Sequence, residues 1–280
     1  MRELVIVFAP AGATIQDAGR PGWLHVGVPA SGPLDASAHA AANLAVGNDA
    51  RAAAVEVPLG PIRVRTHGEI VLSVDGEAPV TIPDGGELLV PACERAVRCL
   101  AAEGGLEVPL VLGSRATLVV AGFGGLDGRA LRAGDRLHVG QHSRGSLPRS
   151  AFPTISEPED PAVLRVQPGP HLHRLSADAF DQLLATTWRI SPRSDRVGVR
   201  LEGATVGRRG DDRAPPVPMV RGAIQITTDG TPIVLGPDHP VTGGYPVVAV
   251  VSRASQAILA RLRAKRAVRF ALSAVAAATG

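Results

Sequence analysis

The segment Thr14-Ile-Gln-Asp-Ala-Gly-Arg-Pro-Gly22 is followed closely by Gly27-Val-Pro-Ala-Ser-Gly-Pro-Leu-Asp35, and Thr242-Gly-Gly-Tyr-Pro246 lies far downstream. In each segment, glycine or proline sets an unusual backbone conformation while a polar or charged side chain projects from it. Loops built in this way carry function more often than simple connections do. We therefore interpret the three segments as walls of one site.

Short β patterns surround the first two segments. Turn signals such as Asp75-Gly76 separate these patterns at the spacing of about 8–12 residues that is typical of a sandwich or barrel. One helix is predicted over residues 36–46, with Asp35 as its N-cap and Gly47 as its C-terminal stop. The first half is therefore predicted to be nearly all β, with strands at 4–8, 53–57, 62–65, 69–74, 80–82, 87–90, 97–101 and 136–139.

Residues 141–161 are rich in Ser, Pro, Arg and Glu and contain no periodic segment, so we expect the domain boundary there. The predicted domains are residues 1–150 and residues 160–280. In the second half, a helix over 176–185 with Ser176 as its N-cap and a basic helix over 255–266 are expected, and residues 271–280 are expected to fray. Strands are predicted at 163–166, 222–226, 232–235 and 247–251.

Composition excludes several classes of protein. The chain has 280 residues, of which 45% are hydrophobic, enough for two domains or one large β domain. A net charge of +3 and only eight scattered aromatic residues, five Phe, two Trp and one Tyr, argue against nucleic-acid binding. No apolar run reaches the roughly 20 residues that span a bilayer, and the run after Met1 is too short for an export signal. We expect a soluble cytoplasmic protein in which Cys93 and Cys99 are reduced thiols.

Several signatures of enzymes and metal sites are absent from the sequence. It has no Gly-x-x-x-x-Gly-Lys-Ser/Thr loop, His-Glu-x-x-His, Gly-x-Ser-x-Gly or dinucleotide fingerprint. His171 and His173 have no clear third partner, so a turn is the simpler setting and no metal site is predicted. Lys265 is the single lysine and lies among arginines, which excludes a Schiff-base lysine and a biotin-carrier lysine.

Some polar residues allow two interpretations. Glu56 lies on a predicted strand, where it is either a surface residue or an acid that faces a ligand, and spacing does not decide. The segment 191–198 is either an ordinary salt-bridged turn, which is the simpler interpretation, or part of the site. The turn 242–244 could direct consecutive backbone N–H groups at an anion. Arg20, held by the Pro21-Gly22 turn, suits a carboxylate or a phosphate.

Six motifs taken in order resemble those of the biotin-dependent carboxyltransferase family, which includes the C subunit of 5-oxoprolinase and allophanate hydrolase subunit 2. The motifs, which cover nearly the whole chain, are Gln16-Asp17-x-Gly19-Arg20-Pro21-Gly22, Gly27-Val-Pro-x-Ser31-Gly32-x-x-Asp35, Val111-Leu-Gly-Ser-Arg115, Ser191-Pro-Arg-Ser-Asp-Arg-Val-Gly198, Gly222-Ala-Ile-Gln225 and Thr242-Gly-Gly-Tyr-Pro246. The resemblance implies a mainly β fold of two cyclophilin-like β-barrel domains with a few short helices.

The resemblance also implies partners and a reaction. The site would be completed by a B-type (KipI-like) protein, and an A-type protein also acts in prokaryotic 5-oxoprolinase. The overall reaction there opens 5-oxo-L-proline to L-glutamate with ATP hydrolysis. Relatives fused to urea carboxylase move a carboxyl group from biotin to urea, and a sporulation-related (KipA-like) member antagonises a kinase inhibitor.

The sequence departs from the family pattern at three places. Trp23 stands where the family usually has Tyr after Arg-Pro-Gly. Pro216-Val-Pro218 replaces a Ser-Glu-Gly motif, so a carboxylate expected near the site is lost, and Ala264-Lys-Arg266 replaces a Pro-Gly-Asp turn before a last strand.

The candidate site residues follow from this resemblance and from the chemistry. Guanidinium groups and the amides of 242–244 suit carboxylate or phosphate, and carboxylates can position water. The expected catalytic residues are Asp17, Arg20, Glu56, Arg193 and Asp195. The expected substrate-binding residues are Gln16, Ser31, Asp35, Arg196, Gln225, Thr242, Gly243, Gly244 and Tyr245. We expect Arg20, Asp35, Arg193 and Tyr245 to rim one cavity.

Three functions remain open on the sequence alone. The first is a component of 5-oxoprolinase that acts on a lactam only with its A and B partners and with ATP. The second is carboxyl transfer to urea or a related amide from a biotin carrier supplied in trans, because the chain has no Ala-Met-Lys-Met. The third is a non-catalytic protein that binds a B-type regulator. Neighbouring genes for an A-type protein, or for a biotin carboxylase and carrier, would separate the first two.

Overall fold

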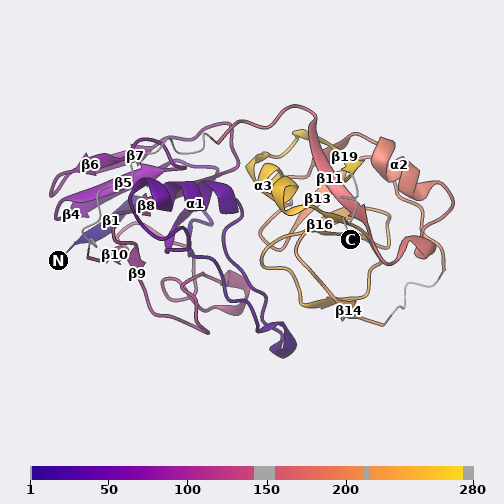
Figure 1. The fold of residues 1–280 in the computed structure, drawn as a ribbon, viewed down its shortest axis with the longest axis horizontal. Coiled ribbons are helices and arrows are strands. Elements are labelled where there is room, and N and C mark those ends of the chain that lie inside the picture. The colour runs from indigo at the N-terminus through magenta and orange to yellow at the C-terminus, as the bar shows by residue number, and fades with distance from the viewer. Residues whose placement is uncertain (1, 142–154, 211–214, 274–280) are drawn as a thin grey trace, which may run out of the picture. The chain divides into compact units, whose positions relative to one another are not determined.

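The computed structural model describes residues 2–141, 155–210 and 215–273. The chain divides into two compact units (Figure 1). Unit 1 comprises Met1–Trp23 and Ala30–Glu157, and unit 2 comprises Leu24–Pro29 and Pro158–Gly280. The division along the chain falls between Glu157 and Pro158, and most of the expected linker, residues 142–154, lies outside the described residues.

Unit 1 consists of two antiparallel five-stranded sheets. One sheet has the order β7-β4-β1-β10-β9, and the other has the order β2-β3-β8-β5-β6. The bounds in the first sheet are β1 Glu3–Phe8, β4 Ile62–His67, β7 Glu87–Val90, β9 Leu106–Glu107 and β10 Arg136–Val139. Those in the second are β2 Thr14–Gln16, β3 Ala54–Pro58, β5 Ile70–Val74, β6 Val80–Ile82 and β8 Val97–Ala102. All eight strands predicted in this half are present.

The two sheets enclose one apolar core. In β4, Ile62, Val64 and Thr66 are buried while the three residues that alternate with them are exposed, which is the pattern of a half-buried strand. Side chains of both sheets, such as Leu4 and Leu100, belong to the same cluster. Each fully buried aliphatic side chain contributes about 1.5–3 kcal/mol, so this interior holds unit 1 together.

Helix α1 (Ala36–Ala45) covers the sheet of β5 and β8 (Figure 1). Asp35 is its N-cap, as predicted, because its carboxylate accepts hydrogen bonds from the backbone N–H groups of Ser37 and Ala38 at 3.0 and 3.1 Å. The helix ends at Ala45, and its C-cap Val46 is followed by Gly47, which has a φ of 78°. Its small residues allow close packing, since a Cβ on Gly76 would lie 2.7 Å from the Ala41 Cβ.

Unit 2 is a closed barrel in the order β11-β18-β15-β16-β13-β12-β19, where β11 and β19 pair in parallel. The bounds are β11 Ala162–Pro168, β12 Trp188–Ile190, β13 Gly198–Glu202, β15 Ala223–Ile226, β16 Pro232–Leu235, β18 Val247–Val251 and β19 Ala267–Leu272. A separate pair joins β14 (Val217–Pro218) to β17 (Thr242–Gly243).

Short 3-10 helices in the two units lie at Leu24–Val26, Val119–Ala121 and Leu172–Arg174. The mainly β prediction is confirmed.

The bounds of two helices in unit 2 differ from the prediction. Helix α2 (Ala179–Ala185) begins after Asp178, and the backbone N–H of Ser176 donates to the carbonyl of Gly207. Helix α3 (Arg253–Arg261) is capped by Ser252 and ends before the predicted residue 266. The chain then turns at Lys265, with a φ of 74°, and enters β19, so Ala271 and Leu272 belong to a barrel strand and do not fray. The rest of that expected frayed end, residues 274–280, lies outside the described residues.

Two further expectations from composition can be compared with the fold. Cys93 and Cys99 are both free thiols, as expected, and Cys99 is buried. Among the helices of the described chain, we find no segment with the length and apolar character needed to cross a membrane.

Candidate functional site

The two glycine-rich segments of unit 1 lie directly against each other. The backbone N–H of Arg20 donates to the carbonyl of Ala30 at 2.7 Å. Gly19 has a φ of 84°, and a Cβ there would lie 2.4 Å from that same carbonyl oxygen. The close approach therefore requires glycine. The structure thus brings residues 16–20 and 30–35 together, as the sequence predicted for these two segments.

Asp17 fastens the first segment to a distant loop. Its carboxylate accepts hydrogen bonds from Gly19 N at 2.8 Å, from Ser114 Oγ at 2.5 Å and from Arg115 N at 2.5 Å. Three donors hold this carboxylate in place, which identifies Asp17 as an anchor for residues 111–115.

Arg20 is turned inward and is only 1% exposed. Its guanidinium donates to the carbonyls of Val111, at 3.4 Å, and Ala116, and it lies 5.0 Å from the centre of the Phe123 ring. These contacts close the loop that Asp17 also holds. Arg20 was expected to bind an anion, but its guanidinium donates these hydrogen bonds to backbone carbonyl oxygens.

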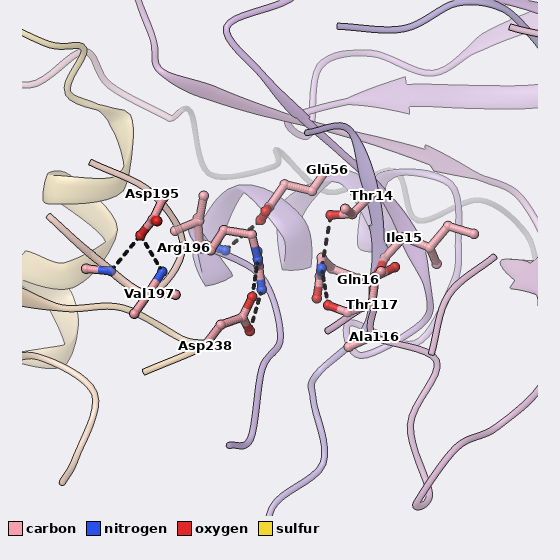
Figure 2. Close-up of polar contacts among 12 residues, drawn as sticks. Thr14, Ile15, Gln16, Glu56, Ala116, Thr117, Asp195, Arg196, Val197 and Asp238 are labelled. Carbon is pink, nitrogen blue, oxygen red and sulfur yellow. Dashed lines mark hydrogen bonds and ion pairs between the residues drawn. The ribbon is translucent and has the colours of Figure 1, made fainter. Parts of the chain in front are cut away.

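Two buried polar atoms in the same region have no hydrogen-bond partner among the described residues. Gln16 donates from Nε2 to Thr14 Oγ1 at 3.0 Å and to the Thr117 carbonyl at 3.1 Å (Figure 2), which leaves Oε1 unsatisfied. Ser31 is 6% exposed, has a φ of 56°, and its Oγ is also unsatisfied. Because an unsatisfied buried polar atom costs about 1–3 kcal/mol, both atoms are candidate contacts for a ligand or water.

Asp35 and Glu56 line one small space, which we call the acidic hollow. Its volume is about 10 Å³, and its polar lining residues are Asp35, His39, Glu56, Arg98 and Cys99. That volume holds about one water molecule. Glu56 is 4% exposed and accepts a hydrogen bond from Leu34 N at 2.6 Å. The interpretation of Glu56 as a surface residue is therefore wrong.

His39 was not identified from the sequence as a site residue. Its Nε2 lies 3.1 Å from the carbonyl oxygen of Gln16, so this nitrogen carries the hydrogen, because a carbonyl can only accept. Burial lowers the pKa of His39 below 6.5, and the hydrogen bond to Gln16 offsets only part of that effect. The ring is therefore neutral at pH 7. The available signal was its position in the helix, four residues after Asp35 on the same face.

In unit 2, the loop 191–198 holds itself together. The Asp195 carboxylate accepts hydrogen bonds from Val197 N at 2.9 Å and from Gly198 N at 3.1 Å. Arg196 forms a two-pronged ion pair with Asp238 at 2.7 and 3.2 Å (Figure 2). The simpler interpretation of this segment was a salt-bridged turn, and Arg196 forms such a salt bridge.

The segment 242–246 is not the expected anion-binding turn. Thr242 and Gly243 form strand β17, so their N–H groups do not converge on one point. Gln225 is close to this strand, since its Nε2 donates to the Tyr245 carbonyl at 3.3 Å. The Tyr245 side chain is 40% exposed and lies beside Arg208, 5.9 Å from ring centre to guanidinium. Gly244 follows β17 directly.

Arg193 lines another hollow, this one in unit 2, whose lining also includes Ser191, Arg200 and Glu202. The prediction that Arg20, Asp35, Arg193 and Tyr245 rim one cavity stays a prediction. Among the described residues, no group of three or more His, Cys, Asp or Glu side chains could hold a metal ion, and His171 instead accepts a hydrogen bond from Val247 N at 3.0 Å.

Comparison with known proteins identifies the class. Residues 26–272 match the family model described as carboxyltransferase domain, subdomain A and B. The chain belongs to this family, which confirms the resemblance found in the sequence motifs.

Two relatives and one solved structure show how the chain compares with whole proteins. It is 34% identical to the C subunit of 5-oxoprolinase from Escherichia coli (strain K12), over 95% of this chain and 90% of that protein. It is 30% identical to the C subunit of 5-oxoprolinase from Haemophilus influenzae, over 92% of this chain and 87% of that one. The crystal structure of the K. lactis urea amidolyase matches 97% of this chain with a TM-score of 0.88 and 28% identity, but the chain covers only 19% of that enzyme.

Proposed function

We propose that this chain is the C subunit of an ATP-dependent 5-oxoprolinase, which opens 5-oxo-L-proline to L-glutamate together with the A and B subunits. The observation that carries the proposal is the end-to-end match to the Escherichia coli protein, which covers 95% of this chain and 90% of that protein. By contrast, the chain corresponds to 19% of the K. lactis urea amidolyase. The two free thiols support a cytoplasmic location for the complex.

The reaction requires more than this chain supplies. A lactam amide is stabilised by resonance, so opening it near neutral pH calls for activation, for example phosphorylation of the amide oxygen. The developing charge also needs fixed hydrogen-bond donors. The acidic hollow, at about 10 Å³, has no room for a lactam, ATP or biotin. We therefore assign the binding of these molecules to a site that the A and B subunits complete.

Within that shared site, we assign Glu56 to the attacking water. Glu56 is a buried carboxylate that lines a space of one-water size, and a carboxylate in hydrogen-bond reach of water can orient it and accept its proton. His39 lines the same hollow but stays neutral, because burial disfavours its charged form, so Glu56 is the base. Asp17 and Arg20 have a positioning role, because they fix residues 111–116 against the same segment.

The proposal is tested by assaying ATP-dependent formation of glutamate from 5-oxo-L-proline. The chain is assayed alone and after co-expression with the A- and B-type proteins encoded beside it. We expect turnover only with all three proteins. Robust activity of the isolated chain, or none in the purified complex, would contradict the proposal.

A pair of variants tests the role of Glu56 in the same complex. Glu56→Gln keeps the size of the side chain but removes the base, so we expect kcat to fall by about 100-fold while the complex still assembles. The matched control is Glu94→Gln, because Glu94 is exposed and lies outside the acidic hollow. Equal activity of the two variants would remove Glu56 from the mechanism.

One observation favours a second candidate, carboxyl transfer from biotin to urea or a related amide. The fold matches the K. lactis urea amidolyase with a TM-score of 0.88. In this case a biotin carboxylase and a biotinyl carrier would have to come in trans, since Lys265 is the single lysine of the chain and is paired with Glu202 at 2.9 Å. Biotin-dependent carboxylation of urea by the assembled proteins, without glutamate formation, would establish this alternative.

A further inference from the structure

Unit 2 contains a hollow of about 230 Å³ that neither proposed reaction uses. We call it the arginine hollow. It lies where the chain leaves β12, along the outer side of β13, and at the turns 203–205 and 230–231. Pockets for drug-sized ligands measure about 300–1,000 Å³, so this space suits a small molecule or ion.

The sequence of β13 explains which side chains face the hollow. Leu201 is 1% exposed and points into the barrel core, so its neighbours Arg200 and Glu202 point outward. Small residues leave the space above them open. Gly230 has a φ of 79°, and a Cβ there would lie 2.3 Å from the Thr205 Cγ2, so the turn must remain glycine.

The carboxylate in the hollow is already satisfied. Glu202 accepts hydrogen bonds from Ser191 Oγ at 2.8 Å and from Lys265 Nζ at 2.9 Å. The hydrogen bond from Lys265 is the largest cause that holds the pKa of Glu202 below its ordinary value, followed by the one from Ser191. Glu202 is therefore ionised at pH 7, and the charges of both Lys265 and Arg193 favour its ionised form.

The two arginines are not satisfied in the same way. Within the described part of the chain, the guanidinium groups of Arg193 and Arg200 donate no hydrogen bond and form no ion pair, although both line the hollow. The other charges nearby are Arg189, which lies opposite Glu202 in the β12–β13 pair, and Asp229, whose carboxylate is bound by Thr231. Among the residues that line the hollow itself, two arginines thus face one carboxylate, and the charge of the lining is positive.

We propose that the arginine hollow binds a small oxyanion, a carboxylate or a phosphate group, held by Arg193 and Arg200. Guanidinium groups present planar pairs of donors that match both anions. The exposed residue Thr205 lines the same space, and its hydroxyl supplies a further donor. This site lies wholly in unit 2 and is independent of the proposed function, because it predicts binding without turnover.

Isothermal titration calorimetry of the full chain tests the proposal. Sodium phosphate and sodium L-glutamate are titrated separately at constant ionic strength, because screening alone changes weak charge interactions. We expect saturable binding of at least one anion. Tighter binding of phosphate would identify a phosphate-bearing ligand, and tighter binding of glutamate a carboxylate. The absence of saturable binding for both would overturn the proposal.

A double variant locates the site. The double variant Arg193→Gln with Arg200→Gln removes both guanidinium groups. We expect its affinity for the bound anion to fall at least about tenfold, which corresponds to the loss of one charge-assisted contact. The control is Arg63→Gln with Arg269→Gln, which removes the same charge at exposed positions outside the hollow. Circular dichroism confirms that both variants fold. Unchanged binding in the first variant, or equal loss in the control, would also overturn the proposal.

Discussion

Arginines in the two units have different roles. In unit 1, Arg20 is 1% exposed and donates to the carbonyls of Val111 and Ala116. In unit 2, Arg193 and Arg200 line an open hollow, and their guanidinium groups donate to no other described residue. A guanidinium enclosed by carbonyl oxygens holds a loop in place, whereas one beside open space is available to a ligand. The same residue type next to a proline or glycine turn can therefore be part of the scaffold or part of a binding site.

The carboxylates show the same contrast within unit 1. Asp17 receives three hydrogen bonds that fasten a loop. Glu56 accepts a hydrogen bond of 2.6 Å from Leu34 N and also faces a space of one-water size. Hydrogen bonding alone therefore does not separate a structural acid from a candidate catalytic one, and the space beside the carboxylate has to be considered as well.

The largest effect is expected for Arg20→Leu. The substitution leaves the carbonyls of Val111 and Ala116 without this donor, and each unsatisfied carbonyl costs about 1–3 kcal/mol, so we expect unfolding free energy to fall by about 2–5 kcal/mol. Urea denaturation followed by circular dichroism measures this loss. The matched control is Arg63→Leu on the exposed side of β4. A loss below about 1 kcal/mol for Arg20→Leu would break the contrast, because Arg20 would then not be part of the scaffold.

A smaller effect is expected at the start of α1. Asp35→Ala removes the N-cap acceptor of Ser37 N and Ala38 N, so unfolding free energy should fall by about 1–2 kcal/mol. Asp35→Ser retains a capping oxygen and should recover most of the loss. If the serine and alanine variants are equally destabilised, Asp35 acts through the acidic hollow and not through the cap.

The buried His39 predicts a pH dependence of similar or smaller size. Because the folded pKa lies below 6.5, the unfolded chain takes up a proton first as the pH falls. The stabilisation is complete above pH 6.5 and is lost as the pH falls from there toward the folded pKa. In the His39→Gln variant, the fall in unfolding free energy should be smaller by up to about 1 kcal/mol over the first pH unit below 6.5. Urea titrations at several pH values measure this, with His67→Gln on the exposed face of β4 as the control.

The smallest effect on stability is expected for Arg193→Gln. Its side chain is exposed and makes no hydrogen bond with another described residue, so unfolding free energy should change by less than about 0.5 kcal/mol. Urea denaturation compares it with the wild-type chain. A loss near that of Arg20→Leu would show that Arg193 supports the fold, and the contrast between the units would disappear.

Several elements could be predicted because their signals are local. The alternation in β4 and the capping of α1 by Asp35 depend on neighbours within a few residues, and both are present in the structure. The N-cap prediction failed at Ser176, whose backbone N–H bonds to Gly207, a residue distant in sequence. The β segments expected on either side of residues 191–198 are present as β12 and β13, but their bounds were not predicted, because β12 has only three residues and also pairs with the distant strand β19.

The site shows the same limit. The sequence singled out Asp17, Arg20 and Glu56 through their place beside glycine, proline and β patterns, but it did not indicate which of them would be enclosed by carbonyl groups. His39 was missed because its place on the face of Asp35 does not by itself show that the ring is buried against Gln16. Ser31 was identified, but only the fold shows that its hydroxyl is buried without a partner among the described residues.

The sequence by itself determined the mainly β character, the capped helix after Asp35, and membership of the carboxyltransferase family, because periodicity, caps and ordered motifs are encoded in neighbouring residues. Tertiary structure alone decided that Arg20 closes a loop, that the acidic hollow forms beside Glu56, and that Arg193 and Arg200 face another hollow. The physical reason is that burial and hydrogen-bond partners come from residues far apart in the chain, 91 positions in the case of Arg20 and Val111.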